Sequence, residues 1–139
     1  MKSILKICLY AVALMLISKC VDPVYYIKIN NQTTSDISVL PGCKPYAGNQ
    51  YPDTTLPLEK PFYLMRISKN NSGALESNIP WNEKINLLPS DTLSIIYFVA
   101  DSVDLVPWEK IRSKYMIFKR EVYSSEDLES NNWTITVNN

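Results

Sequence analysis

Thr92–Ala100, with the sequence TLSIIYFVA, is the most hydrophobic stretch of the chain beyond its first twenty residues. Apolar side chains stand at both odd and even positions, so neither face of a strand formed here can be left to solvent. Strands that are apolar on both faces lie inside a sheet and are covered on both sides. The stretch therefore predicts a central strand, for which the rest of the chain supplies neighbours and cover.

The other expected strands are short, and apolar residues alternate with polar ones along several of them. They are Val24–Asn30, Ile37–Leu40, Phe62–Ser68, Ala74–Ile79, Tyr115–Val122 and Trp133–Val137. The polar turns at 30–36 and 69–73 predict that the first two strands pair as a hairpin and that the next two do the same. Seven or so strands in about 115 residues predict a mainly β fold, a single antiparallel β-sandwich of the Ig-like or transthyretin-like kind.

Two similar segments, Ile79–Ile85 and Val106–Ile111, each place a Pro before a Trp and an Ile. Pro is tolerated at the first position of a helix, and residues three or four apart share one helix face. We expect two short helices that hold Trp81 and Trp108 against the sheet. Ser124–Asp127 predicts a third, because a serine cap followed by acidic residues starts a helix. The connections are thus expected to contain two or three short helices.

The first twenty residues, Met1–Cys20, have the three-part layout of an export signal. Lys2 and Lys6 carry positive charge, residues 7–17 are an unbroken run of eleven apolar residues, and Cys20 follows shortly after. A helix of eleven residues rises only about 16 Å, which is too short for a hydrocarbon core of about 30 Å. We therefore expect an export signal at 1–20, a tether at 21–23 and one β-sandwich domain at 24–139.

The residues Ile17-Ser18-Lys19-Cys20 resemble the lipobox of bacterial lipoproteins, in which the chain is cut before a cysteine that has received a diacylglyceryl group. Lys19 departs from the pattern, since that position normally holds Gly, Ala or Ser. The resemblance implies lipidation of Cys20 and a permanent membrane tether. A soluble exported protein and an uncleaved anchor are the alternatives. An unlipidated Cys20 could form a disulfide with Cys43, whereas an acylated Cys20 leaves Cys43 without that partner.

Several segments resemble a group of small uncharacterised lipoproteins of Bacteroides-type bacteria. They include Tyr51–Thr54, Asp91–Ser94, Ala100–Val103, Trp108–Ile111, Tyr115–Arg120, Ser125–Leu128 and Asn132–Ile135. The resemblance covers part of the chain closely and the rest in layout. It implies a place in the cell envelope, as an outer-membrane lipoprotein, and it implies no particular reaction.

Exported proteins of such bacteria carry O-glycans where Asp precedes Ser or Thr and a small or apolar residue follows. Three sites are similar to this acceptor, and the resemblance implies Thr54, Ser102 and Thr92 as candidates for O-glycosylation. Thr54 ranks first because it lies in a predicted loop, and Thr92 ranks last because it opens the central strand. Asp-Thr and Asp-Ser are also ordinary turn and strand-start pairs, and that alternative stays open.

The chain contains no His, which removes Ser-His-Asp and Cys-His catalysis together with the commonest metal ligand. Neither zinc nor calcium spacing is present, so no metal or cofactor is expected. Two carboxylate pairs, Asp101 with Asp104 and Glu126 with Asp127, could serve a hydrolase. Both lie at predicted helix starts, where acidic residues favour the helix dipole. We expect no enzyme, and a carboxylate-based hydrolase is the outside alternative.

Charge and aromatic residues indicate the kind of partner. The first twenty residues hold three Lys and no acid, so the remaining 119 carry 11 basic and 14 acidic side chains, a net charge of −3. No nucleic-acid partner is expected, because phosphates require clustered Lys and Arg. Tyr46 and Tyr51 lie in a Pro-rich stretch that is the longest irregular segment, and they are the candidate ligand or partner surface.

Together these features predict an exported, lipid-anchored protein of the cell envelope with a non-enzymatic binding or structural role. Its partners are expected to be the membrane, through the lipid, and an envelope protein or glycan. The alternative is a carbohydrate-binding accessory protein that uses Tyr46 and Tyr51.

Overall fold

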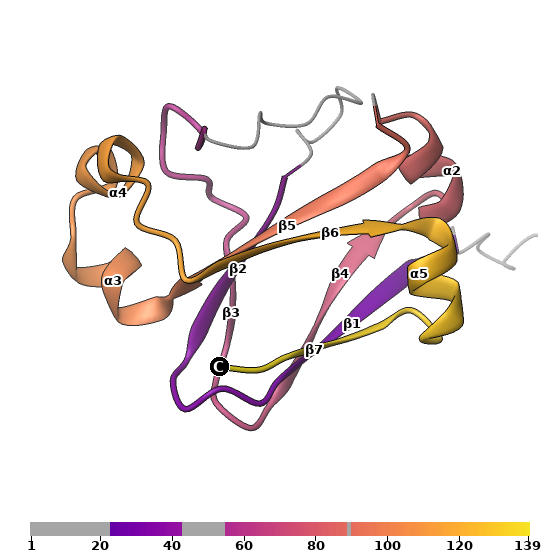
Figure 1. Ribbon diagram of the computed structural model, residues 1–139, viewed down its shortest axis with the longest axis horizontal. Helices are drawn as coiled ribbons and strands as arrows, with labels where there is room; N and C mark the ends of the chain where they lie inside the picture. Colours follow the sequence, from indigo (N-terminus) through magenta and orange to yellow (C-terminus); the bar gives the residue numbers. More distant parts are fainter. Residues whose placement is uncertain (1–22, 43–54, 89) are drawn as a thin grey trace, which may run out of the picture.

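The computed structural model describes residues 23–42, 55–88 and 90–139, which form two β-sheets and several short helices (Figure 1). In chain order the elements are β1 (Tyr25–Asn31), β2 (Ile37–Pro41), β3 (Met65–Ile67), β4 (Ser72–Ser77), α2 (Trp81–Asn86), β5 (Thr92–Val99), α3 (Ala100–Leu105), α4 (Trp108–Lys114), β6 (Lys119–Ser124), α5 (Ser125–Ser130) and β7 (Thr134–Val137). The prediction of a mainly β fold with two sheets is confirmed.

The central strand is confirmed, because β5 lies between β2 and β6 in a four-stranded sheet of order β3-β2-β5-β6. Six consecutive residues of β5, Leu93–Phe98, are buried. Leu93, Ile95 and Tyr97 belong to the core between the two sheets. Ile96 and Phe98 belong to a second core on the other face of the same sheet. Both faces of β5 are therefore covered, as its unbroken apolar sequence requires.

The second sheet has three strands in the order β4-β1-β7. β1 is antiparallel to β4 but parallel to β7, so the expectation of a wholly antiparallel sandwich is wrong at this pair. The reason lies in the connection before β7. The chain leaves β6 through α5, and a helical connection lets the last strand enter the other sheet in the same direction as β1.

The two predicted hairpins are also wrong. β1 and β2 lie in different sheets, and so do β3 and β4. Four consecutive residues of β2, Ile37–Leu40, are buried, which requires cover on both faces, as in the four-stranded sheet. β3 and β4 instead approach each other across the sandwich at Gly73, where an added Cβ would lie 2.9 Å from Ile67 Cδ1 and 3.0 Å from Met65 Sδ.

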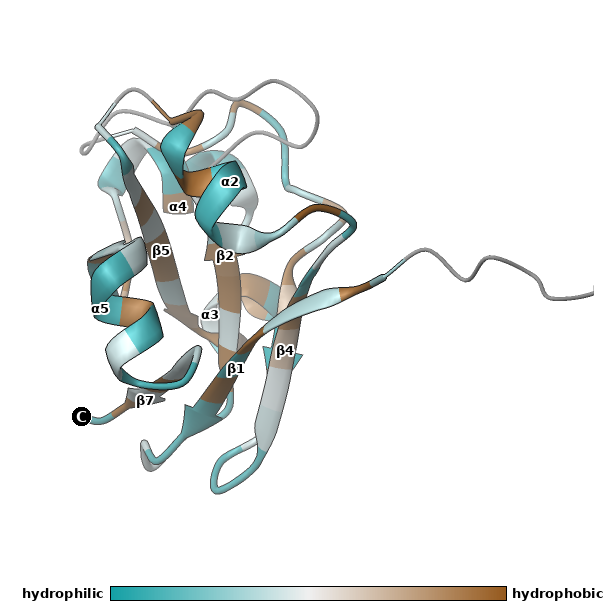
Figure 2. Ribbon diagram, turned by 90° about the vertical axis from the view of Figure 1, so that its right-hand side faces the viewer, coloured by the Kyte–Doolittle hydropathy of each residue, from teal (hydrophilic) through white to brown (hydrophobic). Residues whose placement is uncertain are grey.

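The molecule has three layers, and the four-stranded sheet is the middle one. The first core fills the space between the two sheets, and side chains from α2 and α5 complete it. These two helices lie at the same end of the sandwich (Figures 1 and 2). The second core lies between the opposite face of the four-stranded sheet and a layer formed by α3, α4 and residues 56–64. The three-stranded sheet thus buries one face and leaves the other to solvent.

Both Pro-Trp segments form the predicted helices, α2 and α4. Trp81 is 4% exposed, and its indole N–H donates a hydrogen bond to the Tyr25 carbonyl at 3.2 Å. Trp108 packs against Phe98 with ring centroids 5.7 Å apart, and its indole N–H donates to the Pro57 carbonyl at 3.0 Å. The helices therefore pin their tryptophans as expected, Trp81 in the first core and Trp108 at the edge of the second.

The serine cap of the third predicted helix is confirmed at α5. The backbone N–H of Asp127 donates to the Ser124 hydroxyl at 3.1 Å, and the Asp127 carboxylate accepts the backbone N–H of Ser124 at 2.9 Å. This reciprocal arrangement is a capping box. Hydrogen bonds from the Ser124 hydroxyl and N–H lower the pKa of Asp127 below its ordinary value.

Several boundaries differ from those expected. β3 is Met65–Ile67 where Phe62–Ser68 was predicted, and β4 is Ser72–Ser77 where Ala74–Ile79 was predicted. α3 follows β5 directly, so the described residues contain four short helices where two or three were predicted. β6 begins at Lys119 and not at Tyr115, because Tyr115 ends α4 in a left-handed conformation with φ of 47°. That conformation closes a helix and turns the chain.

Candidate functional site

The outward side of the three-stranded sheet has no covering layer among the residues that the structure describes. Along β1 the inward positions are buried and the outward ones reach solvent. The outward positions, here called the outer sheet face, are Tyr26, Lys28 and Asn30 on β1, Ser72, Ala74 and Glu76 on β4, and Thr134 and Thr136 on β7. Tyr26 is 52% exposed and is the aromatic residue on this face.

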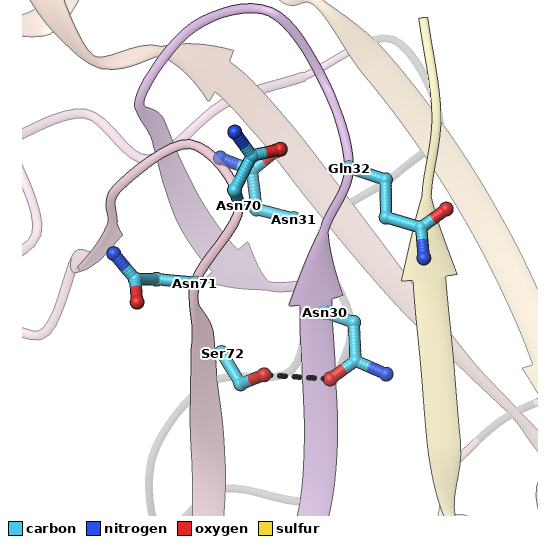
Figure 3. A pocket seen from close by; sticks show the side chains of 6 residues that line it. All are labelled: Asn30, Asn31, Gln32, Asn70, Asn71 and Ser72. Carbon is cyan, nitrogen blue, oxygen red and sulfur yellow. Dashed lines mark hydrogen bonds between the residues drawn. The ribbon is translucent and has the colours of Figure 1, made fainter.

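One end of the outer sheet face opens into a pocket, here called the amide pocket, of about 480 Å³. It is lined by Asn30, Asn31, Gln32, Asn70, Asn71 and Ser72 (Figure 3). The volume is similar to that of small-molecule sites, but this pocket is open to solvent and its lining residues are all polar, whereas such sites are mostly apolar. Five of the six side chains are carboxamides, which can donate and accept hydrogen bonds at the same time.

Asn31 lines the pocket, and its side-chain amide is fully hydrogen-bonded within the protein. Its side chain is 1% exposed. The amide nitrogen donates to the carbonyls of Ser35 at 2.9 Å and Ile67 at 3.1 Å, and the amide oxygen accepts the N–H and hydroxyl of Thr33 at 3.0 and 2.7 Å. Asn31 therefore ties the end of β1 to β3 in the other sheet and has no free hydrogen-bonding group for a ligand.

The remaining amides are differently placed. Asn30 and Ser72 face each other across the β1–β4 pair, and the Ser72 hydroxyl donates to the Asn30 amide oxygen at 2.7 Å (Figure 3). The side chains of Gln32, Asn70 and Asn71 make no hydrogen bond with the part of the chain that the structure describes. Their exposed amide groups are open to a ligand.

Backbone hydrogen bonds fix the main chain of the residues that carry these amides. Asn31 N donates to the Asn71 carbonyl at 2.9 Å, and Asn70 N donates to the Asn31 carbonyl at 2.9 Å. On the other side, Gln32 N donates to the Val137 carbonyl at 2.9 Å. Asn70 has φ of 59°, a left-handed conformation that Asn tolerates better than most residues. The main chain around the pocket is thus held in place before any ligand arrives, whereas the exposed amides of Gln32, Asn70 and Asn71 would be ordered on binding at an entropic cost.

An ionic cluster joins β3 to α3. The Arg66 guanidinium lies 2.5 Å from the Asp104 carboxylate, 3.1 Å from that of Asp36 and 3.7 Å from that of Asp101. The N–H of Lys69 and then the Arg66 guanidinium lower the pKa of the Asp36 carboxyl. Asp101 lies in the first turn of α3 as expected, but Asp104 lies near its end, so the prediction of a helix-start position is wrong for Asp104. Both carboxylates have a structural partner in Arg66.

The predicted site residues fall partly outside the described ranges. Cys20, Cys43, Tyr46, Tyr51 and Thr54 all lie there. Among the described residues, Thr92 is half-buried at the start of β5, with its hydroxyl 2.7 Å from that of Ser90. Ser102 is half-buried within α3.

Sequence reasoning missed the outer sheet face and the amide pocket. The sequence indication of the pocket is two clusters of polar residues, 30–32 and 70–72, but each cluster by itself predicts a turn. Only the pairing of β1 with β4 brings them together.

Within residues 23–42, 55–88 and 90–139, no group of three or more potential ligand side chains could hold a metal ion. No helix in the same ranges combines the length and apolar character that crossing a membrane requires. Comparison of the chain with protein-family models, with curated proteins and with solved structures found no match.

Proposed function

We propose that this chain is an exported protein of the cell envelope, anchored in the outer membrane through a lipid on Cys20, with a non-enzymatic binding role. The layout of residues 1–20 and the lipobox-like ending at Cys20 support export and lipidation. The resemblance to small lipoproteins of Bacteroides-type bacteria supports the same cellular location. We also propose that the two-sheet fold is a β-sandwich of the Ig-like or transthyretin-like kind.

One observation carries the binding role. β1 begins at Tyr25, directly after the tether, and ends at Asn31 in the amide pocket. Seven residues in a strand span roughly 20 Å. The pocket therefore lies at the opposite end of β1 from the point where the anchored tether enters the domain. A protein held at Cys20 would present the pocket away from the membrane, where a partner in the surrounding space can reach it.

Membrane fractionation tests the anchor. The Cys20→Ala variant is expected to leave the membrane fraction, because it loses the thiol that would carry the acyl chains. Cys43→Ala is the matched control and is expected to remain with the membrane after a carbonate wash. If Cys20→Ala stays in the washed membranes, the lipid anchor is wrong. If the unchanged protein is itself absent from the washed membranes, the soluble exported alternative, with its possible Cys20–Cys43 disulfide, gains support.

The proposed O-glycosylation has a separate test. Protein purified from the native host is expected to carry glycan mass on the peptide that contains Thr54. Ser102 follows in rank, and Thr92 comes last because its hydroxyl already contacts that of Ser90 at the start of β5. Unmodified peptides at all three positions would remove the proposal.

A further inference from the structure

We propose that the outer sheet face, from Tyr26 to the amide pocket, binds a neutral glycan chain. The inference rests on the proposed binding role and deepens it by naming the surface and the ligand class. It differs from the carbohydrate-binding alternative of Tyr46 and Tyr51, because it uses residues of β1, β4 and the adjoining turns.

Charge on this surface favours an uncharged ligand. None of the six residues that line the amide pocket is ionisable. The outward positions of the three strands add one cation, Lys28, and one anion, Glu76, which neighbour each other diagonally across the β1–β4 pair. The surface thus has no excess of either sign with which to hold a polyanion or a polycation. Nucleic acid and acidic polysaccharides are poor matches for it.

The free amides favour a ligand rich in hydroxyl groups. Gln32, Asn70 and Asn71 each offer two N–H donors beside a carbonyl acceptor, and a hydroxyl can satisfy either kind of group. An apolar ligand would strip water from these amides without replacing its hydrogen bonds, which is unfavourable. Gln32 and Asn71 point away from each other (Figure 3), and a sugar chain presents hydroxyls along its length, so its successive rings can engage different amides.

Tyr26 supplies the apolar contact that a sugar ring also needs. Its ring is half-exposed on the same face of β1 as Asn30, and an exposed aromatic ring offers a large rigid surface at low entropic cost. Asn30 is four positions further along β1, a distance of about 13 Å. A ligand that reaches both must extend beyond one ring, so the site favours an oligosaccharide that runs along β1.

A peptide is the main competing ligand and would use a different part of the sheet. Extended peptides add to a sheet by pairing with the backbone of an open edge strand. β4 and β7 are the edges of this sheet, whereas Tyr26 and Asn30 project from β1, its central strand. Ligands that lie across the face of β1 must be recognised by side chains, which suits a glycan.

Binding of the full-length chain, purified in detergent, to an array of neutral and acidic oligosaccharides tests the proposal. We expect retention on neutral oligosaccharides of two or more rings. Tyr26→Ala, and separately the double variant Gln32→Ala with Asn71→Ala, should each weaken binding about tenfold, the loss expected for one well-placed contact. Val122→Ala is the control, since Val122 is exposed on β6 in the other sheet and its replacement should leave binding unchanged.

Four results would overturn the proposal, and the first three concern the oligosaccharide array. They are the absence of binding to any neutral oligosaccharide, binding to acidic oligosaccharides alone, and neutral binding that survives both sets of changes. Binding that disappears only in a Tyr46→Ala, Tyr51→Ala variant would also reject this surface. Urea midpoints equal to that of the unchanged protein show that the variants are folded. Fractionation of Cys20→Ala separately tests the anchor, so either proposal can fail while the other stands.

Discussion

Replacing Asn31 by alanine should remove the hydrogen bonds that hold the end of β1 to the turn at 33–35 and to the opposite sheet. Four such bonds involve this one side chain, two donated to the carbonyls of Ser35 and Ile67 and two accepted from Thr33. The Thr33 hydroxyl keeps a partner, because it also lies 2.8 Å from the Ser35 carbonyl. Three bonds are therefore lost in effect. At about 1 kcal/mol each, Asn31→Ala should destabilise the fold by about 3 kcal/mol.

That loss is a large share of the total of about 5–15 kcal/mol typical of a domain, so urea unfolding should detect it readily. Asn71→Ala is the matched control. Asn71 lines the same pocket but its side chain is exposed and makes no hydrogen bond within the described residues, so its loss should change the unfolding free energy by at most about 0.5 kcal/mol. Equal effects of the two changes would refute the assignment of Asn31 as the structural amide and Asn71 as the free one.

Three further changes test other parts of the fold by urea unfolding. Ser124→Ala should lower the unfolding free energy by about 1 kcal/mol, because it removes the α5 cap. Ser125→Ala should lower it less, because the Ser125 hydroxyl is buried without a partner in the described part of the chain. Equal losses would contradict the capping box. Trp108→Phe should cost about 1 kcal/mol by leaving the Pro57 carbonyl without its indole donor, and an unchanged midpoint would argue against that bond. Asp36 has a lowered pKa in the folded state. Ionised Asp36 therefore stabilises the fold above the unfolded carboxyl pKa of about 3.9, and this stabilisation is lost as the pH falls through the pKa of Asp36 in the folded state. Asp36→Asn should therefore reduce the loss of stability on acidification below about pH 4, and an undiminished acid transition would show that Asp36 does not contribute to it.

The sequence predicted those elements whose signal is local. β5 was predicted because its apolar side chains occur on both faces, a pattern that only an interior strand satisfies. α5 was predicted from Ser124 and the acids that follow it, since the cap and its partner Asp127 are three residues apart. In both cases the residues that decide the structure are neighbours along the chain.

Strand pairing was harder to predict because alternation shows which face of a strand is buried but not which sheet contains it. The polar turn at 32–36 could close a hairpin or carry the chain across the sandwich. Burial of Asn31 favours the crossing, because its amide bonds to the Ile67 carbonyl in the other sheet. An asparagine beside a turn gives no sign in the sequence that it will be buried. The parallel entry of β7 was missed for the same reason, since it depends on the placement of α5.

The candidate site could not be predicted from local patterns. Tyr26 and Asn71 are 45 positions apart in the sequence, and the register that pairs Asn30 with Ser72 brings their strands together. Asparagine pairs are typical of turns, so the clusters at 30–32 and 70–72 predict loops and give no indication of a pocket. Export and lipidation, by contrast, depend on residues 1–20 alone and remain predictions from the sequence.

The intact mass of the protein purified from membranes of its native host tests the lipid anchor most directly. We expect a chain that begins at Cys20 and carries the added mass of a diacylglyceryl group, with further mass if the new N-terminus is acylated or Thr54 is glycosylated. A chain that still contains Met1–Lys19, or one that lacks any lipid mass and shows the loss of two hydrogens expected for a Cys20–Cys43 disulfide, would contradict it.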